Sequence, residues 1–212
     1  VNPSEHMDWY SDLPLMSMLE SIEIVEDKNY TDFRFPVQYV NRPNLNFRGF
    51  CGTVASGVVR KGDEIIVLPS LKKSTIKSIV TYDEELELAH ASMAITLTLE
   101  DEIDISRGDI ITHGDNLPHT ADNFEAVLVW MTDEPLLAGQ QYDFKLCTRT
   151  VQGSVKSFRP RIDVNTLDKV PAPGLELNEI GLVETTLEQP VTFEWYKNNV
   201  ATGNCMRIYQ MN

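Results

Sequence analysis

FRFPVQYVNRPNLNFRGFCGTVASGVVRKGDEIIVLP, residues 33–69, is the stretch of sequence that decides the fold. In its first part, four residues recur at every second position, which is typical of a half-buried β-strand: Phe33, Phe35, Val37 and Tyr39. Residues 48–57 form a second run, in which glycines stand where a strand can bulge or two backbones can approach closely. Residues 58–68 contain a turn followed by an entirely apolar run. The stretch therefore predicts β-strands and no catalytic loop.

The same stretch resembles a known family. GTVASGVVRKGDEIIVLPS at 52–70 resembles the second domain of the translation-factor GTPases, in which a Gly-Thr-Val…Gly…Val…Gly-Asp pattern builds a small β-barrel. FRFPVQYVNRPNLNFRGF at 33–50 resembles one branch of that superfamily, the GTPase large subunit of bacterial ATP sulfurylase (sulfate adenylyltransferase subunit 1). Two further runs match this branch, DEIDISRGDII at 101–111 and MDWYSDLPLMSMLESIEI at 7–24. The resemblance extends from about Met7 to the last residue.

Further short runs rich in β-branched residues predict the remaining strands. They lie on either side of a polar segment, at 75–82, 94–99, 109–113, 124–131, 142–148, 153–163, 180–187 and 205–210. The polar segment, 114–122, contains a proline and is a natural domain boundary. We therefore expect an all-β fold of two antiparallel β-barrels, of the translation-factor domain II and domain III type, in residues 30–115 and 116–212.

Residues 1–29 precede the first barrel and contain one predicted short helix. Leu15, Met18, Leu19 and Ile22 form an apolar stripe at helical spacing. The resemblance implies that this is the final helix of a GTPase domain whose body is absent, so we expect the stripe to be exposed, frayed or packed differently. It also implies a further strand after the last residue of this chain. The second barrel is thus expected to lack its last strand and to expose an edge.

Charge and composition limit the classes of partner. The chain has 32 acidic and 18 basic side chains, a formal net charge of −14, whereas nucleic-acid binding relies on a basic patch. The cysteines are three and widely spaced, which predicts no disulfide framework, and Cys51 and Cys147 are expected to be buried thiols. No apolar run reaches the length of a membrane span, and the first residues lack signal-peptide features. We expect a cytoplasmic protein that binds neither nucleic acid nor membrane.

No stretch predicts a catalytic, cofactor or metal site. Gly57 and Gly62 have the glycine spacing of a P-loop, but Asp63 and Glu64 replace its Lys and Ser/Thr, and carboxylates repel phosphate. The acidic run at 101–109 has the wrong spacing for a calcium loop, and the four histidines lack zinc-site spacing. We expect no catalytic residue, cofactor or metal in this chain. The resemblance places GTP and Mg²⁺ in the absent domain of the parent protein.

One segment has the composition of a contact surface, the predicted loop 41–48 between the first two strands. It combines two Arg, three Asn and a Phe, and Arg and aromatic residues are favoured at the centres of interfaces. Turn chemistry alone also explains its Pro and Asn residues. The candidate partner or interdomain contacts are Arg42, Asn44, Phe47 and Arg48. The resemblance implies that this loop faces the GTPase domain or the small catalytic subunit.

The resemblance also implies a function. The chain would be the β-barrel region of the GTP-hydrolysing regulatory subunit of sulfate adenylyltransferase, which in sulfate assimilation converts ATP and sulfate to adenosine 5′-phosphosulfate and pyrophosphate. The barrels would couple the GTPase state to the small catalytic subunit, and the chain alone would be inactive. Two alternatives stay open: elongation-factor-like barrels that bind tRNA or the ribosome, and a stand-alone β-barrel interaction module. A fused adenylylsulfate kinase in the parent protein is also left open.

Overall fold

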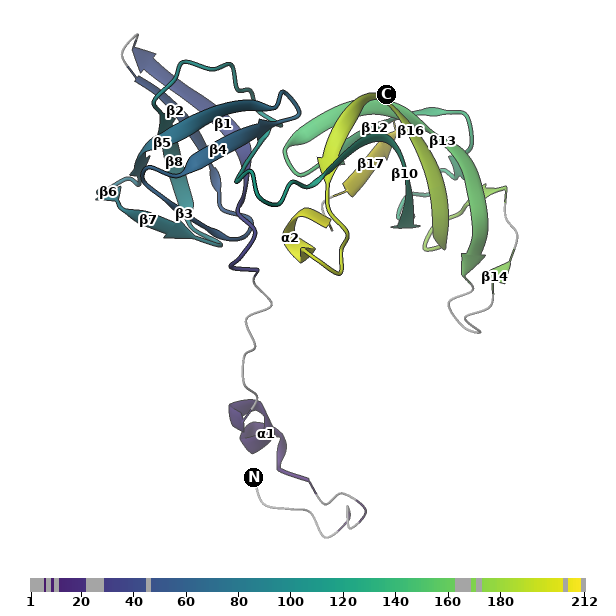
Figure 1. Ribbon diagram of the computed structural model, residues 1–212. Helices are drawn as coiled ribbons and strands as arrows, with labels where there is room; N and C mark the ends of the chain where they lie inside the picture. Colours follow the sequence, from purple (N-terminus) through teal and green to yellow (C-terminus); the bar gives the residue numbers. More distant parts are fainter. Residues whose placement is uncertain are drawn as a thin grey trace.

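The computed structural model of the chain describes residues 6, 9, 12–21, 29–44, 47–162, 169–170, 173–203 and 206–210. Two β-barrels follow one another along the chain, the first on the left and the second on the right of Figure 1. A teal segment that contains Gly114 connects them. The predicted all-β class with a short N-terminal helix is confirmed.

The first barrel is a closed antiparallel sheet. Its strands are β1 (Arg34–Asn44), β2 (Phe47–Thr53), β4 (Glu64–Leu68), β5 (Lys72–Val80), β6 (Glu85–Leu86), β8 (Ala94–Leu99) and β9 (Ile110–Thr112). They are ordered β4-β9-β1-β2-β8-β5-β6, and β4 also pairs with β5, so the sheet closes on itself. Two short strands form a separate pair, β3 (Val58–Arg60) and β7 (Leu88–His90). Each of the six strands in the closed ring therefore has a partner on both sides, whereas the short β6 pairs only with β5.

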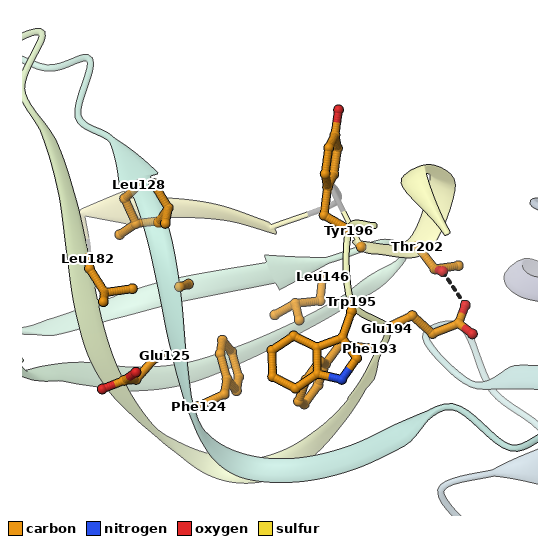
Figure 2. A pocket seen from close by; sticks show the side chains of 13 residues that line it. Phe124, Glu125, Leu128, Leu146, Leu182, Phe193, Glu194, Trp195, Tyr196 and Thr202 are labelled. Carbon is orange, nitrogen blue, oxygen red and sulfur yellow. Dashed lines mark hydrogen bonds between the residues drawn. The ribbon is translucent and has the colours of Figure 1, made fainter. Parts of the chain in front are cut away.

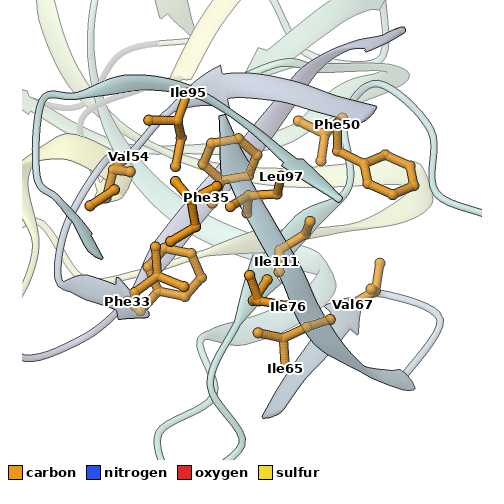
Figure 3. Packing of buried hydrophobic residues seen from close by; sticks show 14 of the residues in the cluster. Phe33, Phe35, Phe50, Val54, Ile65, Val67, Ile76, Ile95, Leu97 and Ile111 are labelled. Atoms are coloured by element: carbon orange, nitrogen blue, oxygen red, sulfur yellow. The ribbon is translucent and has the colours of Figure 1, made fainter. Parts of the chain in front are cut away.

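Aliphatic and aromatic side chains fill the interior of the first barrel. Figure 3 shows how they converge from β4, β5, β8, β9, β1 and the residue before β1, among them Phe33, Phe35, Ile65, Ile76, Leu97 and Ile111. Each of these side chains is at most 1% exposed. Because complete burial of such a side chain contributes roughly 1.5–3 kcal/mol, this cluster is the main source of stability of the first barrel.

The first strand departs from the predicted alternation. Phe35 and Val37 are buried as expected, but Tyr39 is 63% exposed. The register with β2 shifts between Val37 and Tyr39, which marks a β-bulge. An extra residue at a bulge turns the following side chains to the other face, so that Val40 instead packs against the core. The prediction that Tyr39 shares the face of Phe35 was therefore wrong.

The second barrel is built on a sheet ordered β10-β16-β13-β12-β17, with β14 paired to β13. Its elements are β10 (His119–Val129), β12 (Gln141–Leu146), β13 (Arg149–Ile162), β14 (Lys169–Val170), β16 (Ile180–Phe193) and β17 (Met206–Gln210). The strands β11 (Leu136–Leu137) and β15 (Gly174–Leu175) form a separate pair. In the described part of the chain, β10 and β17 are the ends of this sheet. The expected loss of a last strand stays a prediction.

Two short helices complete the fold. Helix α1 (Leu15–Ser21) has no buried residue, and its Leu15 and Leu19 are 69% and 54% exposed, as predicted for the apolar stripe. Ile22 lies outside the described residues. Helix α2 (Val200–Gly203) was not predicted, and it lies between β16 and β17. None of the described helices is long and apolar enough to cross a membrane.

The cysteines correct one expectation. Cys51 and Cys147 are both only half-buried. Cys147 falls within the strand predicted at 142–148, but it lies in the turn between β12 and β13, where it has a φ of 49°. A turn position faces solvent more than a strand position in a barrel wall, which explains why the apolar neighbours of Cys147 do not bury it.

Candidate functional site

The segment predicted as a contact loop is the tip of a β-hairpin. All four candidate residues lie on its strands, Arg42 and Asn44 on β1 and Phe47 and Arg48 on β2. Asn44 pairs with Phe47 across the hairpin, and the register shifts between Asn41 and Asn44. The prediction of a loop was wrong because Pro43, which lacks an N–H, is tolerated where the ladder is already irregular. The two residues at the turn lie outside the described part of the chain.

The hairpin residues do not form a single site. Arg48 is committed to its own barrel, because its guanidinium carbon lies 5.6 Å from the ring centroid of Phe50 and its Nη2 lies 3.5 Å from Oδ1 of Asp104. Arg42 and Asn44 are exposed at the end of β1. Arg42 is thus exposed, whereas Arg48 packs against its own barrel.

A second site, which sequence reasoning missed, lies between the two barrels. Arg34 of β1 is only 1% exposed, although it alternates with the core residues Phe33 and Phe35. Its Nη1 donates to the carbonyl oxygen of Phe33 at 2.9 Å and to Oγ1 of Thr112 at 2.8 Å. Its Nη2 donates at 2.8 Å to Oε1 of Glu194, just after β16 in the second barrel. The outer face of β1 at Arg34 is therefore covered by the second barrel.

Glu194 extends this contact into a closed ring. Its Oε2 accepts hydrogen bonds from Nδ2 of Asn199 at 2.8 Å and from Oγ1 of Thr202 at 2.5 Å, the latter drawn in Figure 2. Nδ2 of Asn199 also donates to Oγ of Ser56 in the first barrel at 2.8 Å. The carbonyl oxygen of Ser56 accepts from the backbone N–H of Arg34 at 3.0 Å. We call Arg34, Glu194, Asn199 and Ser56 the inter-barrel ring, to which each barrel contributes two residues.

A second ion pair joins the barrels elsewhere. Nη1 of Arg149, at the start of β13, lies 3.6 Å from Oδ1 of Asp109 in the first barrel. Gly108 has a φ of 99°, and a Cβ at this position would lie 3.0 Å from the Cβ of Arg149, so a glycine permits the close approach. Burial raises the pKa of Asp109, while the backbone N–H of Ser106 and the charge of Arg149 act in the opposite direction.

The connecting segment is tied to the entrance of the first barrel. Nδ2 of Asn116 donates to Oδ1 of Asp32 at 2.5 Å, and Nδ2 of Asn29 donates to Oδ2 at 2.7 Å. The pKa of Asp32 is lowered, chiefly by the hydrogen bond from Asn29, with further lowering by Asn116 and Arg34 and an opposing effect of burial. This carboxylate therefore links the segment that leads into the first barrel to the connecting segment.

The second barrel has an apolar cavity of about 570 Å³ beside Glu194. Figure 2 shows Phe124, Phe193 and Trp195 close together on its wall, whereas Tyr196 points away. The ring centroids of Phe124 and Phe193 are 5.0 Å apart. The two carboxylates at the cavity are ion-paired, Glu125 with Arg159 and Glu194 with Arg34. The cavity thus offers apolar surface and no uncommitted acid or base within the described residues.

The described residues also contain no group of three or more His, Cys, Asp or Glu side chains that could hold a metal ion. The glycine-spaced segment from Gly57 to Gly62 contains β3 and the start of the turn to β4, in which Oδ2 of Asp63 accepts from the backbone N–H of Arg60 at 2.7 Å. A carboxylate that closes this turn would repel a phosphate, so these residues do not fit a nucleotide.

Family models match both barrels. Residues 51–112 match the family described as Elongation factor Tu domain 2, and residues 123–212 match the family described as GTP-eEF1A C-terminal domain-like. The crystal structure of Sup35 complexed with GMPPNP aligns with a TM-score of 0.76 at 19% identity, over 96% of this chain and 50% of that chain. The apo form of the elongation factor SelB from Methanococcus maripaludis aligns with a TM-score of 0.64 at 22% identity, over 84% and 40% of the two chains. At these identities the likeness concerns the fold alone.

Curated relatives are much closer in sequence. The sulfate adenylyltransferase subunit 1 of Alteromonas mediterranea is 54% identical over 208 residues, which cover 98% of this chain and 44% of the relative. The bifunctional enzyme CysN/CysC of Rhodopirellula baltica is 54% identical over 203 residues, 96% of this chain and 31% of the relative. The chain therefore spans less than half the length of these relatives. Over almost its whole length the chain is similar to a part of the proteins named sulfate adenylyltransferase subunit 1, and its two barrels match the two family models.

Proposed function

We propose that the chain is the β-barrel region of a GTP-hydrolysing regulatory subunit of sulfate adenylyltransferase, and that it couples the GTPase state to the small catalytic subunit. The observation that carries this proposal is the 54% identity over 98% of the chain with a protein named sulfate adenylyltransferase subunit 1. The whole enzyme would join ATP and sulfate into adenosine 5′-phosphosulfate and pyrophosphate. GTP and Mg²⁺ would bind outside this chain, whose glycine-spaced turn does not fit a phosphate.

The barrels act in this proposal as a connecting body. GTPases change the order and packing of switch segments when the γ-phosphate is lost. A body that transmits such a change has to keep its own shape, and the inter-barrel ring and the Asp109–Arg149 pair join the two barrels directly. Arg42 at the exposed hairpin tip is a group through which the first barrel would contact the GTPase domain or the small subunit. The chain supplies contacts in this scheme, while the adenylyl transfer takes place on the small subunit.

Reconstitution of the complete enzyme tests the proposal. The full-length subunit would be mixed with the small catalytic subunit, and pyrophosphate release from ATP and sulfate would be measured with GTP, with GDP and without nucleotide. We expect release to be stimulated by GTP alone. The 212-residue chain added to the small subunit should give no release with any nucleotide. Absence of GTP-stimulated release from the full-length pair would contradict the proposal.

A binding assay separates this function from that of a translation factor. Filter binding of the chain to tRNA would be measured at low and high salt, because a protein that neutralises phosphates shows a steep salt dependence. With a formal net charge of −14, we expect no binding at either concentration. Binding at low salt that is lost at high salt would instead favour a tRNA-binding function.

A further inference from the structure

We propose that the inter-barrel ring sets the relative orientation of the two barrels and contributes little to the stability of the protein. In this view Arg34 and Glu194 fix one orientation of the two barrels, where other orientations could bury a similar area. The inference goes beyond the proposed function and does not depend on it, because the orientation is a property of the chain by itself.

The first observation is that the ring is a costly way to stabilise a junction. The side chains of Arg34 and Glu194 are only 1% and 10% exposed, so both charges lose most of their contact with water. Such a loss is repaid only when every polar atom of the pair finds a partner. Nε of Arg34 is buried and has no hydrogen-bond partner among the described residues. Apolar side chains of similar size at these two positions would avoid the burial of two charges, although Thr112, Asn199 and Thr202 would each lose a hydrogen bond.

The second observation is that the ring is highly directional. A buried ion pair alone would tolerate some rotation, but here both oxygens of the Glu194 carboxylate are used, one by Arg34 and the other by Asn199 and Thr202. The same amide nitrogen of Asn199 reaches back to Ser56. Rotation of one barrel against the other would break several of these bonds together and would leave buried groups unpaired, which is expensive.

The third observation is that the contacts between the barrels are spread over the junction. The ring supplies two contacts, from Arg34 to Glu194 and from Ser56 to Asn199. The pair of Asp109 and Arg149 supplies a third, further along β1, where the backbone N–H of Val37 donates to the carbonyl oxygen of Asp109. Two contacts leave one axis of rotation free, and a third contact away from that axis removes it. The three together define a single orientation.

The test compares stability with orientation in the 212-residue chain. Single variants Arg34→Met and Glu194→Leu each leave one buried charge without its partner, so we expect a clearly lower urea midpoint for both. The double variant Arg34→Met/Glu194→Leu removes both charges, and we expect its urea midpoint to lie above those of the two single variants. Residual dipolar couplings then report the orientation. We expect one alignment tensor to fit both barrels of the wild type, and two different tensors to be needed for the double variant.

The control removes charges that do not cross the junction. Lys156 and Glu184 form an exposed pair inside the second barrel, 2.8 Å between Nζ and Oε1. Lys156→Gln/Glu184→Gln should keep the urea midpoint and the single tensor. Two results would each overturn the inference. In one, the double variant stays as unstable as the single variants, which makes the ring a source of stability. In the other, a single tensor still fits both barrels of the double variant.

Discussion

The carboxylate of Asp109 and the guanidinium of Arg149 lie 3.6 Å apart across the junction between the barrels, and burial nevertheless raises the pKa of Asp109. The cost of removing the carboxylate from water thus exceeds what Arg149 and the Ser106 N–H return. A carboxyl whose folded pKa lies above its unfolded pKa holds its proton longer in the native state. The native state then binds more protons between the two pKa values, and the free energy of unfolding falls as pH rises through that window.

Asp109→Asn should remove this pH dependence. We expect the variant to gain stability relative to the wild type as pH rises from below the ordinary pKa of Asp to neutrality, because the neutral amide avoids the desolvation of a carboxylate. The measurement is the urea midpoint of both proteins between pH 3.5 and 7, about the range in which Asp carboxyls titrate. Asp115→Asn, an exposed carboxylate of the connecting segment, is the matched control. A difference between Asp109→Asn and wild type that stays constant with pH would contradict this prediction.

Asp32 should show the opposite sign. Its pKa is lowered by the hydrogen bonds from Asn29 and Asn116, so its contribution to stability is present above the unfolded pKa and is lost as pH falls through the folded pKa. Asn116→Ala removes one of these bonds. We expect a loss of about 0.5–1 kcal/mol at pH 7, since the site is partly exposed, and a smaller loss or none once Asp32 is protonated.

Urea titrations at neutral and acidic pH measure this difference, with Asn198→Ala as control. Asn198 is exposed, and its hydrogen bond to Trp195 uses the backbone N–H, which alanine retains. The prediction would be wrong if Asn116→Ala and the wild type differed by the same amount at both pH values.

The sequence predicted the barrels well because their cores follow local rules. A strand that buries one face shows the period of two, and Ile65 to Leu68 shows the apolar run of a strand buried on both faces. Prediction from the sequence failed where strand pairing and contacts between barrels depend on geometry that no local pattern contains. The bulge after Val37 moved Tyr39 to the surface, and the outer face of Arg34 was covered by a residue 160 positions away. A charged residue inside an apolar strand was the one available hint, and an arginine there is ordinary on a solvated face.

A core substitution tests the closed barrel directly. Leu97 of β8 is 0% exposed and belongs to the cluster in Figure 3. Leu97→Ala should cost about 2–5 kcal/mol in the free energy of unfolding, because it removes buried methyl groups and leaves a cavity in a closed ring of strands that cannot collapse easily. Leu88→Ala, at a position that is 38% exposed, should cost less than about 1 kcal/mol. Equal effects of the two changes on urea midpoints would argue against the core as described.

The hairpin tip separates a contact residue from a structural one. Arg42 is exposed, whereas Arg48 lies over the ring of Phe50 and pairs with Asp104. In the full-length subunit, Arg42→Ala should therefore weaken binding to the GTPase domain or the small catalytic subunit with no change in the urea midpoint. For an arginine near the centre of an interface the loss is about 1–2 kcal/mol, roughly tenfold or more in Kd.

Arg48→Ala should instead lower the urea midpoint, because it removes packing on Phe50 as well as a charge. Calorimetric titration of the small subunit with each full-length variant measures binding between the two subunits. GTP-stimulated pyrophosphate release reports a contact between the barrel and the GTPase domain of the same subunit.

Lys61→Ala is the control, because Lys61 is exposed and its ion pair with Glu85 is solvated. If Arg42→Ala and Lys61→Ala bind and stimulate alike, the hairpin tip is not a contact surface and the partner binds another face of the barrels.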